Sequence, residues 1–178
     1  MGFTKYVFNN LLGWKIVGDF SPSIKKVVII VVPHTSWHDF YIGVFIRRIS
    51  KIQINWIGKK ELFIWPIGRY FRYMGGTPID RKTNQNKVEA IAAIFKSRKE
   101  FRLSLAPEGT RKKVERWKTG YYYIAQAAKV PIIAVSFDYK TKTVSINKPF
   151  YLTNDIEADT NVLRSYFKGV VGKNPKYT

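Results

Sequence analysis

The chain has 178 residues, of which 46% are hydrophobic and 16% aromatic, so we expect residues 1–178 to fold as one globular domain. It contains no cysteine, which excludes disulfide bonds, thiol catalysis and thiolate metal sites. The 31 lysine and arginine residues outnumber the 12 aspartate and glutamate residues and give a formal net charge of +19, so we expect an anionic partner: nucleic acid, an acidic membrane surface or a phosphorylated substrate.

The start of the chain bears on its relation to membranes. Residues 1–10 lack the apolar core of a secretory signal, and no apolar stretch anywhere approaches the ~20 residues that span a bilayer. We therefore expect a protein that neither crosses a membrane nor is exported. Residues 1–20 carry apolar side chains at helical spacing among lysines, which predicts a helix that either packs on the domain or lies in a membrane surface.

Strand and helix signals alternate along the rest of the chain. The predicted strands are 27–32, 52–57, 101–106, 131–137 and 143–147. The predicted helices are 39–51, 61–74 with interruptions at Pro66 and Gly68, 88–95, 117–129 and 160–171. In the first of these helices, Phe40, Val44 and Ile46 are expected to face inward. The alternation predicts an α/β fold, in which helices flank a mostly parallel central sheet and an amphipathic helix precedes it.

The first predicted strand is followed by His34 and, five positions later, by Asp39. On one continuous helix these side chains would lie ~140° apart and could not meet. If His34 lies in the turn and Asp39 in the first helical turn, the carboxylate can hold one imidazole nitrogen as a donor. The other nitrogen is then free to accept a substrate hydroxyl proton, as in a catalytic triad whose nucleophile comes from the substrate. The alternative is a purely structural role, in which the histidine caps the helix and the aspartate lies on the surface at the positive end of the helix.

His34 and His38 also have the i, i+4 spacing of a helical zinc pair. They are the only two histidines, there is no cysteine, and the glutamate expected beside such a pair is absent. We therefore expect no metal site and interpret His38 as a polar or packing neighbour.

A second motif, Glu108-Gly109-Thr110-Arg111, follows another predicted strand. Gly109 permits a tight turn with exposed backbone donors, and Arg111 can bind a phosphate through two hydrogen bonds. An ordinary basic turn is the alternative. The segment 75–81 has the same pattern and ends in an aspartate and Arg81, which by themselves are expected to pair with each other.

Together these motifs resemble the glycerolipid acyltransferase family, which includes the lysophosphatidate (1-acylglycerol-3-phosphate) acyltransferases. The resemblance covers about residues 27–139 and depends on four segments in family order. They are His34-x4-Asp39, residues 60–63 running to 75–81, residues 107–111 and residues 130–135. Many relatives have asparagine where this chain has Pro33, which bears on the acceptor more than on the reaction.

The resemblance implies a membrane-associated enzyme that moves a fatty acyl group to the hydroxyl of a lysophospholipid such as 1-acylglycerol 3-phosphate. Acyl-carrier protein or acyl-coenzyme A is the co-substrate, and no bound cofactor is expected. By this similarity His34 is the general base and Asp39 its orienting partner. The residues implied for the acceptor's phosphate are Arg81, Glu108, Gly109, Thr110 and Arg111. The implied location is the cytoplasm, peripheral on the cytoplasmic face of the cell membrane.

The positive charge fits this interpretation. Basic and aromatic residues alternate over residues 47–72, which suits an anionic lipid surface at ~1 kcal/mol for each lysine or arginine near it. The same positive electrostatic field would attract an acidic carrier protein. Backbone N–H groups near His34 or Gly109 are the candidates for stabilising the oxyanion of acyl transfer.

Three other interpretations stay open from the sequence. A basic nucleic-acid-binding protein is the main one of another class, although it leaves His34, Asp39 and Glu108 without a role and the chain shows no RNP-like, KH-like or zinc-finger motif. A second is a non-catalytic lipid-surface protein. Within the resembling family, the third is an acyltransferase for another acceptor, such as a lyso-ornithine lipid or a glycolipid precursor.

Overall fold

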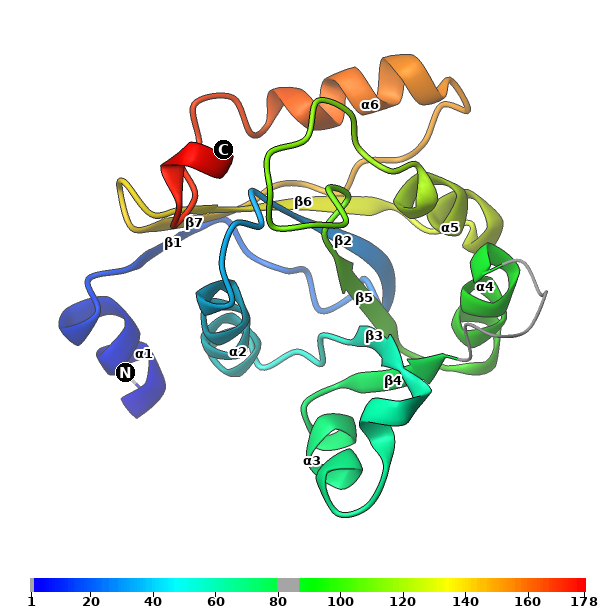
Figure 1. Ribbon diagram of the computed structural model, residues 1–178, viewed down its shortest axis with the longest axis horizontal. Coiled ribbons are helices and arrows are strands. Elements are labelled where there is room, and N and C mark those ends of the chain that lie inside the picture. The colour runs from blue at the N-terminus through cyan, green and yellow to red at the C-terminus, as the bar shows by residue number, and fades with distance from the viewer. Residues whose placement is uncertain (1, 80–86) are drawn as a thin grey trace.

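A five-stranded sheet forms the middle layer of the computed structural model, which describes residues 2–79 and 87–178 (Figure 1). Its strand order is β1-β7-β6-β2-β5, and all neighbours are parallel except β6 and β7. The strands are β1 (Lys15–Val17), β2 (Lys26–Val32), β5 (Phe101–Leu105), β6 (Ile132–Asp138) and β7 (Thr143–Ile146). The predicted mostly parallel sheet is confirmed.

Helices cover both faces of this sheet (Figure 1). One face packs against α4 (Lys87–Ser97), α5 (Gly120–Ala128) and α6 (Ile156–Ser165). The other packs against α2 (His38–Ser50) and an N-terminal helical segment, α1 (Phe3–Tyr6) and the π-helical turn η1 (Val7–Leu11). Successive residues of β2 face opposite layers, because side chains alternate along a strand. Val28 and Ile30 therefore belong to the first core, and Val27 and Ile29 to the second.

A second, two-stranded sheet lies beside β5. Its parallel strands are β3 (Trp56–Lys59) and β4 (Gly76–Ile79), and a bridge from Asn55 to Leu103 joins it to the main sheet. Between the two strands run the 3-10 helix η2 (Lys60–Phe63) and α3 (Ile67–Tyr73), which project away from the domain (Figure 1). We call residues 59–75 the β3–β4 arm.

The N-terminal helix is present and packs on the domain with one side. The ring of Phe8 is buried and lies 5.4 Å from that of Phe45 in α2, whereas Phe3, Tyr6 and Leu11 are exposed. None of the helices within residues 2–79 and 87–178 is both long enough and apolar enough to span a bilayer.

Several elements differ from the expectations. The short strands β1 and β4 were not predicted, and the strand expected at 52–57 lies at Trp56–Lys59. Helix α5 is shorter than the predicted 117–129, and α6 ends at Ser165 and not at 171. Helix α6 begins at Ile156, four residues before the predicted start at 160, because the Asp155 carboxylate accepts hydrogen bonds from the N–H groups of Glu157 and Ala158 and caps the helix there.

Candidate active site

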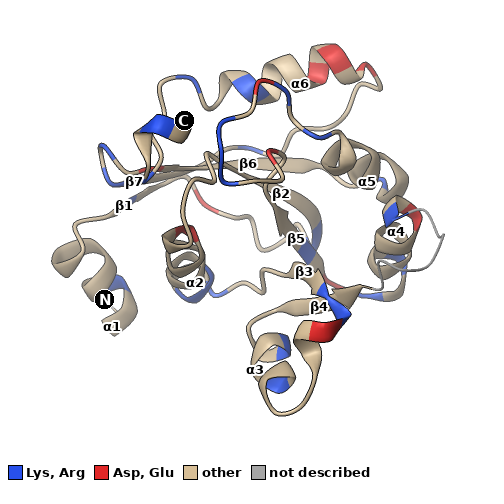
Figure 2. Cartoon of the chain, in the orientation of Figure 1, with Lys and Arg blue, Asp and Glu red and all other residues tan. Residues whose placement is uncertain are grey.

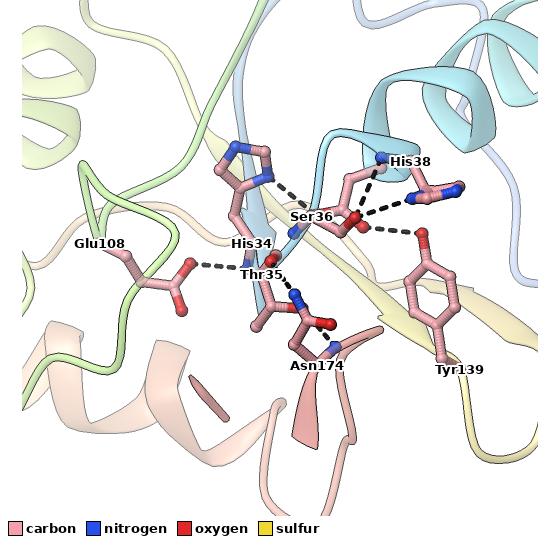
Figure 3. Close-up of polar contacts among 8 residues, drawn as sticks. His34, Thr35, Ser36, His38, Glu108, Tyr139 and Asn174 are labelled. Carbon is pink, nitrogen blue, oxygen red and sulfur yellow. Dashed lines mark hydrogen bonds and ion pairs between the residues drawn. The ribbon is translucent and has the colours of Figure 1, made fainter. Parts of the chain in front are cut away.

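Three parallel strands, β5, β2 and β6, lie next to one another and end at the same edge of the sheet. His34 follows β2, Glu108 follows β5 and Tyr139 follows β6. Open α/β sheets bind their ligands outside the carboxyl ends of the strands. The fold therefore brings residues that are far apart in sequence to one place at this edge (Figure 3).

The histidine and the aspartate meet, as predicted. Nδ1 of His34 lies 2.9 Å from Oδ2 of Asp39. Helix α2 begins at His38, so Asp39 lies in its first turn and His34 in the loop before it. The side chain of Asp39 is 3% exposed and that of His34 is 29% exposed. The carboxylate is thus shielded, while the His34 ring is partly exposed and its other nitrogen points away from the contact with Asp39 (Figure 3).

Asp39 accepts two further hydrogen bonds. Its Oδ2 accepts from the Ser36 N–H at 3.1 Å, and its Oδ1 accepts from the Tyr139 hydroxyl at 2.7 Å. Burial, followed by the hydrogen bond to Asp39, raises the pKa of Tyr139 far above its usual 10.0, so the phenol remains a proton donor. Because every other partner of the carboxylate donates, we assign the proton between the ring and Asp39 to Nδ1 of His34. Nε2 is then the free acceptor.

Glu108 contacts the loop that carries His34. Its carboxylate is buried, and Oε2 accepts a hydrogen bond from the backbone N–H of His34 at 2.8 Å (Figure 3). Burial raises the pKa of Glu108 above its usual 4.5. Through this hydrogen bond Glu108 holds the loop that carries His34.

The raised pKa of Glu108 predicts a pH-dependent gain in stability for Glu108→Gln. The folded state binds this proton more tightly than the unfolded state, so the stabilisation is complete below the usual pKa of 4.5 and is lost as pH rises through the raised value. At pH 7 the ionised carboxylate thus costs stability, whereas glutamine keeps an acceptor for the His34 N–H without a charge. We expect a higher melting temperature for the variant at pH 7 and a shrinking difference toward pH 4, measured by circular dichroism.

The matched variant is Glu108→Ala, which leaves the His34 N–H without this acceptor and should lose ~1–3 kcal/mol of unfolding free energy. A Glu108→Gln variant that is less stable than the parent at pH 7, or whose difference does not change with pH, would contradict this account.

The predicted turn is formed, and part of it faces a cavity. Gly109 has a φ of 65°, a left-handed conformation that favours glycine, and Thr110 and Arg111 are exposed. The Thr110 hydroxyl accepts from the Lys112 N–H at 3.3 Å. Arg81 lies outside the described residues.

Two cavities adjoin His34, and both are also lined by Arg111. The first has a volume of about 340 Å³, within the range of about 300–1,000 Å³ usual for ligand sites. Its walls are mostly apolar and include Val31, Phe40, Val44, Ile54, Met74 and Phe137. The second, of about 560 Å³, is lined by the turn residues Gly109, Thr110 and Arg111. Phe40, expected to face inward, is therefore an exposed wall residue of the first cavity.

The backbone N–H groups of His34 and Gly109 themselves are engaged within the protein. The His34 N–H donates to Glu108, and the Gly109 N–H donates to the Ala106 carbonyl at 3.1 Å. The expected oxyanion donors near these residues stay a prediction. His38 is a polar and packing neighbour, as expected: its Nδ1 lies 2.8 Å from the Ser36 hydroxyl, and its ring lies 4.1 Å from that of Trp37.

A C-terminal segment supports the same loop and was missed from the sequence. The Asn174 side-chain amide donates to the Thr35 carbonyl at 2.9 Å, and its backbone N–H donates to the Thr35 hydroxyl at 3.1 Å (Figure 3). A Cβ atom on Gly172 would lie 2.6 Å from that hydroxyl, so the two segments are in close contact. The loop bearing His34 is thus fixed by Glu108 and by Asn174.

The sequence model of the acyltransferase family matches residues 15–138, which is most of the chain and contains His34, Asp39 and the turn 108–111. The chain belongs to the acyltransferase family. Among its relatives are the 1-acyl-sn-glycerol-3-phosphate acyltransferases of Salmonella typhimurium, 35% identical over 98 residues, and of Escherichia coli, 33% identical over 98 residues. Each match covers 52% of this chain, which thus spans less than half the length of these curated relatives, 40%.

The fold also agrees with a solved structure. The 1-acyl-sn-glycerophosphate acyltransferase PlsC from Thermotoga maritima superposes with a TM-score of 0.65 at 22% identity, over 94% of this chain and 75% of that chain. The glycerolipid acyltransferase resemblance is confirmed by these comparisons, and the nucleic-acid-binding interpretation receives no support from them.

Proposed function

We propose that this acyltransferase moves a fatty acyl group from a thioester of acyl-carrier protein or coenzyme A to the hydroxyl of a lysophospholipid, with 1-acylglycerol 3-phosphate as the leading acceptor. The observation that carries the proposal is the His34–Asp39 pair, which opens onto an apolar cavity whose wall also includes Arg111. The names of the relatives support the acceptor.

In the proposed reaction, Asp39 keeps Nδ1 of His34 protonated, and Nε2 takes the proton of the acceptor hydroxyl. The hydroxyl oxygen attacks the thioester carbonyl, the new C–O bond forms and the C–S bond breaks. The imidazolium then returns its proton to the departing thiolate. A placed general base contributes ~10²–10⁴-fold to such a rate, and holding both substrates in position contributes further.

The cavities beside His34 suit two chemical groups of the substrates, the acyl chain and the acceptor's phosphate. The mostly apolar cavity of about 340 Å³ offers a place for the acyl chain. Arg111 is assigned to the acceptor's phosphate, because a guanidinium pairs with phosphate through two charge-assisted hydrogen bonds. Arg81 is assigned to the same phosphate on the family resemblance alone.

We further assign the protein, as one domain, to the cytoplasmic face of the cell membrane as a peripheral enzyme. A net charge of +19 favours contact with anionic lipid headgroups and with an acidic carrier protein.

The deciding experiment is an assay of purified protein with labelled acyl-carrier protein and acyl-coenzyme A against a panel of lysolipids. Transfer to lysophospholipids supports the proposal, and the preferred thioester identifies the donor. A preference for a lyso-ornithine lipid or a glycolipid precursor would replace the acceptor assignment. No transfer to any lipid would overturn the proposal.

Tyr139→Phe tests the support of the catalytic pair. The substitution removes only the hydroxyl that donates to Asp39. Hydrogen bonds to charged groups contribute ~1.5–3 kcal/mol. Part of this energy should support His34 through Asp39, so we expect kcat to fall about tenfold. KM should stay within about twofold, because Tyr139 lines neither cavity. Steady-state kinetics measure both values, and Tyr151→Phe, at an exposed tyrosine, is the control. An unchanged kcat would exclude this role.

A further inference from the structure

The β3–β4 arm is organised around one buried aromatic side chain. Phe63 is buried, and its ring lies 5.8 Å from that of Trp56 and 6.3 Å from that of Phe71. Two glycines permit this packing: a Cβ on Gly68 would lie 2.1 Å from the Phe63 carbonyl oxygen, and one on Gly76 would lie 2.7 Å from the Phe63 ring. The arm therefore has a small core of its own that fixes its outer side chains.

The outside of the arm carries several exposed apolar side chains. Single exposed apolar residues are common in proteins, but a continuous group of them marks a contact surface. Trp65, at 80% exposure, is the most exposed tryptophan among the large apolar residues that the structure describes as exposed. The exposed apolar residues of the arm are Leu62, Ile64, Trp65, Ile67, Tyr70 and Tyr73.

Basic residues lie among these apolar side chains. Lys59, Arg69 and Arg72 are exposed, and Glu61 is the only acid in the sequence of residues 59–75. Figure 2 shows basic residues on α3, whereas α6 carries both acidic and basic ones. Exposed tryptophan and tyrosine combined with lysine and arginine suit the headgroup region of an anionic bilayer.

The base of the arm forms part of the mouth of the active site. Trp56 and Met74 line the apolar cavity together with His34. Arg47, another wall residue, donates a hydrogen bond to the Tyr73 carbonyl at 3.0 Å and so ties the arm to α2. A lipid surface that receives the arm would therefore lie close to the cavity that we assign to the acyl chain.

We infer that the β3–β4 arm enters the headgroup region of an anionic phospholipid bilayer, with Ile64 and Trp65 as its inserted side chains. The inference deepens the proposed function, since it names the element that holds the enzyme on its lipid substrate. Lipid binding is measured without any acyl transfer, so the two proposals fail separately.

The test is sedimentation of the full chain with vesicles of phosphatidylglycerol and phosphatidylcholine. Trp65→Glu removes an interfacial aromatic and adds a charge that the surface repels, so we expect the partition coefficient to fall about tenfold or more. Tyr151→Glu is the matched control, because Tyr151 is an exposed tyrosine between β7 and α6, and it should bind as the parent does. An unchanged melting temperature checks that Trp65→Glu is folded.

Further arms of the experiment separate the alternatives. If Phe3→Glu abolishes sedimentation and Trp65→Glu does not, the N-terminal helix is the lipid contact and the inference is overturned. A parent protein that does not sediment with anionic vesicles also overturns it and points to a protein partner for the arm. Loss of binding in Trp65→Glu with normal turnover of a detergent-dispersed acceptor supports it. Binding without turnover in the parent would reject the proposed function alone.

Discussion

Replacing His34 with alanine is expected to lower kcat by ~10²–10⁴-fold, the usual contribution of a placed general base. The ring is the group that Asp39 orients and that faces both cavities. Alanine leaves the acceptor hydroxyl with no base other than water. The measurement is steady-state transfer of a labelled acyl group, with vesicle sedimentation in parallel. Sedimentation should not change, because His34 lies outside the β3–β4 arm.

The matched control is His38→Ala, which removes the only other histidine. His38 contacts Ser36 and Trp37 and lines neither cavity, so its loss should change kcat by no more than about threefold, the scale of a surface substitution. If both variants lose activity equally, the effect comes from the fold of the loop. If His34→Ala keeps its full kcat, the catalytic assignment of the pair fails.

Replacing Arg111 with alanine should raise the KM for a phosphate-bearing acceptor by ~10–100-fold. Hydrogen bonds to charged groups contribute ~1.5–3 kcal/mol, and the alanine variant loses those that the guanidinium would make to the phosphate. A smaller change is expected in kcat, because Arg111 is assigned to binding and His34 to proton transfer. Acceptor-dependent rates at saturating thioester measure both values.

Arg116→Ala is the control for charge, because Arg116 is an exposed arginine on the same long loop that lines neither cavity. The KM of this variant for the phosphate-bearing acceptor should stay within about twofold of the parent's KM. A lysolipid without a phosphate provides the second control, since its KM should respond little to Arg111→Ala. An unchanged KM for the phosphate-bearing acceptor would remove Arg111 from the binding site.

Local patterns predicted the elements that carry their own periodicity. The apolar spacing of Val88, Ile91 and Phe95 predicted α4, and the continuous apolar run of β2 predicted a strand buried on both faces. The arm shows the same kind of local signal. A helix with interruptions at Pro66 and Gly68 was expected over 61–74, and the chain forms two short helices there, η2 and α3, with Pro66 at the N-terminal cap of α3. The packing of Gly68 against the Phe63 backbone is not a periodic signal and could not be predicted in this way.

The same distinction applies to the active site. The meeting of His34 and Asp39 followed from a strand-to-helix turn of known length. Tyr139 and Asn174 could not be found in that way, because they contact the His34–Asp39 segment across 100 and 139 residues of sequence. Tyr139 had one usable signal: it follows a predicted parallel strand at the carboxyl edge, where Glu108 also lies. Asn174 follows no strand or motif that would single it out.

The position of Tyr139 and Asn174 has a consequence for truncating or transplanting this chain. Both lie beyond residue 138, where the recognisable family region stops. A fragment cut at that border would carry His34, Asp39 and Arg111 yet lack the phenol that holds the aspartate and the asparagine that holds Thr35. The family region alone therefore lacks two contacts that hold the His34–Asp39 segment in place, and grafts should extend through the final forty residues.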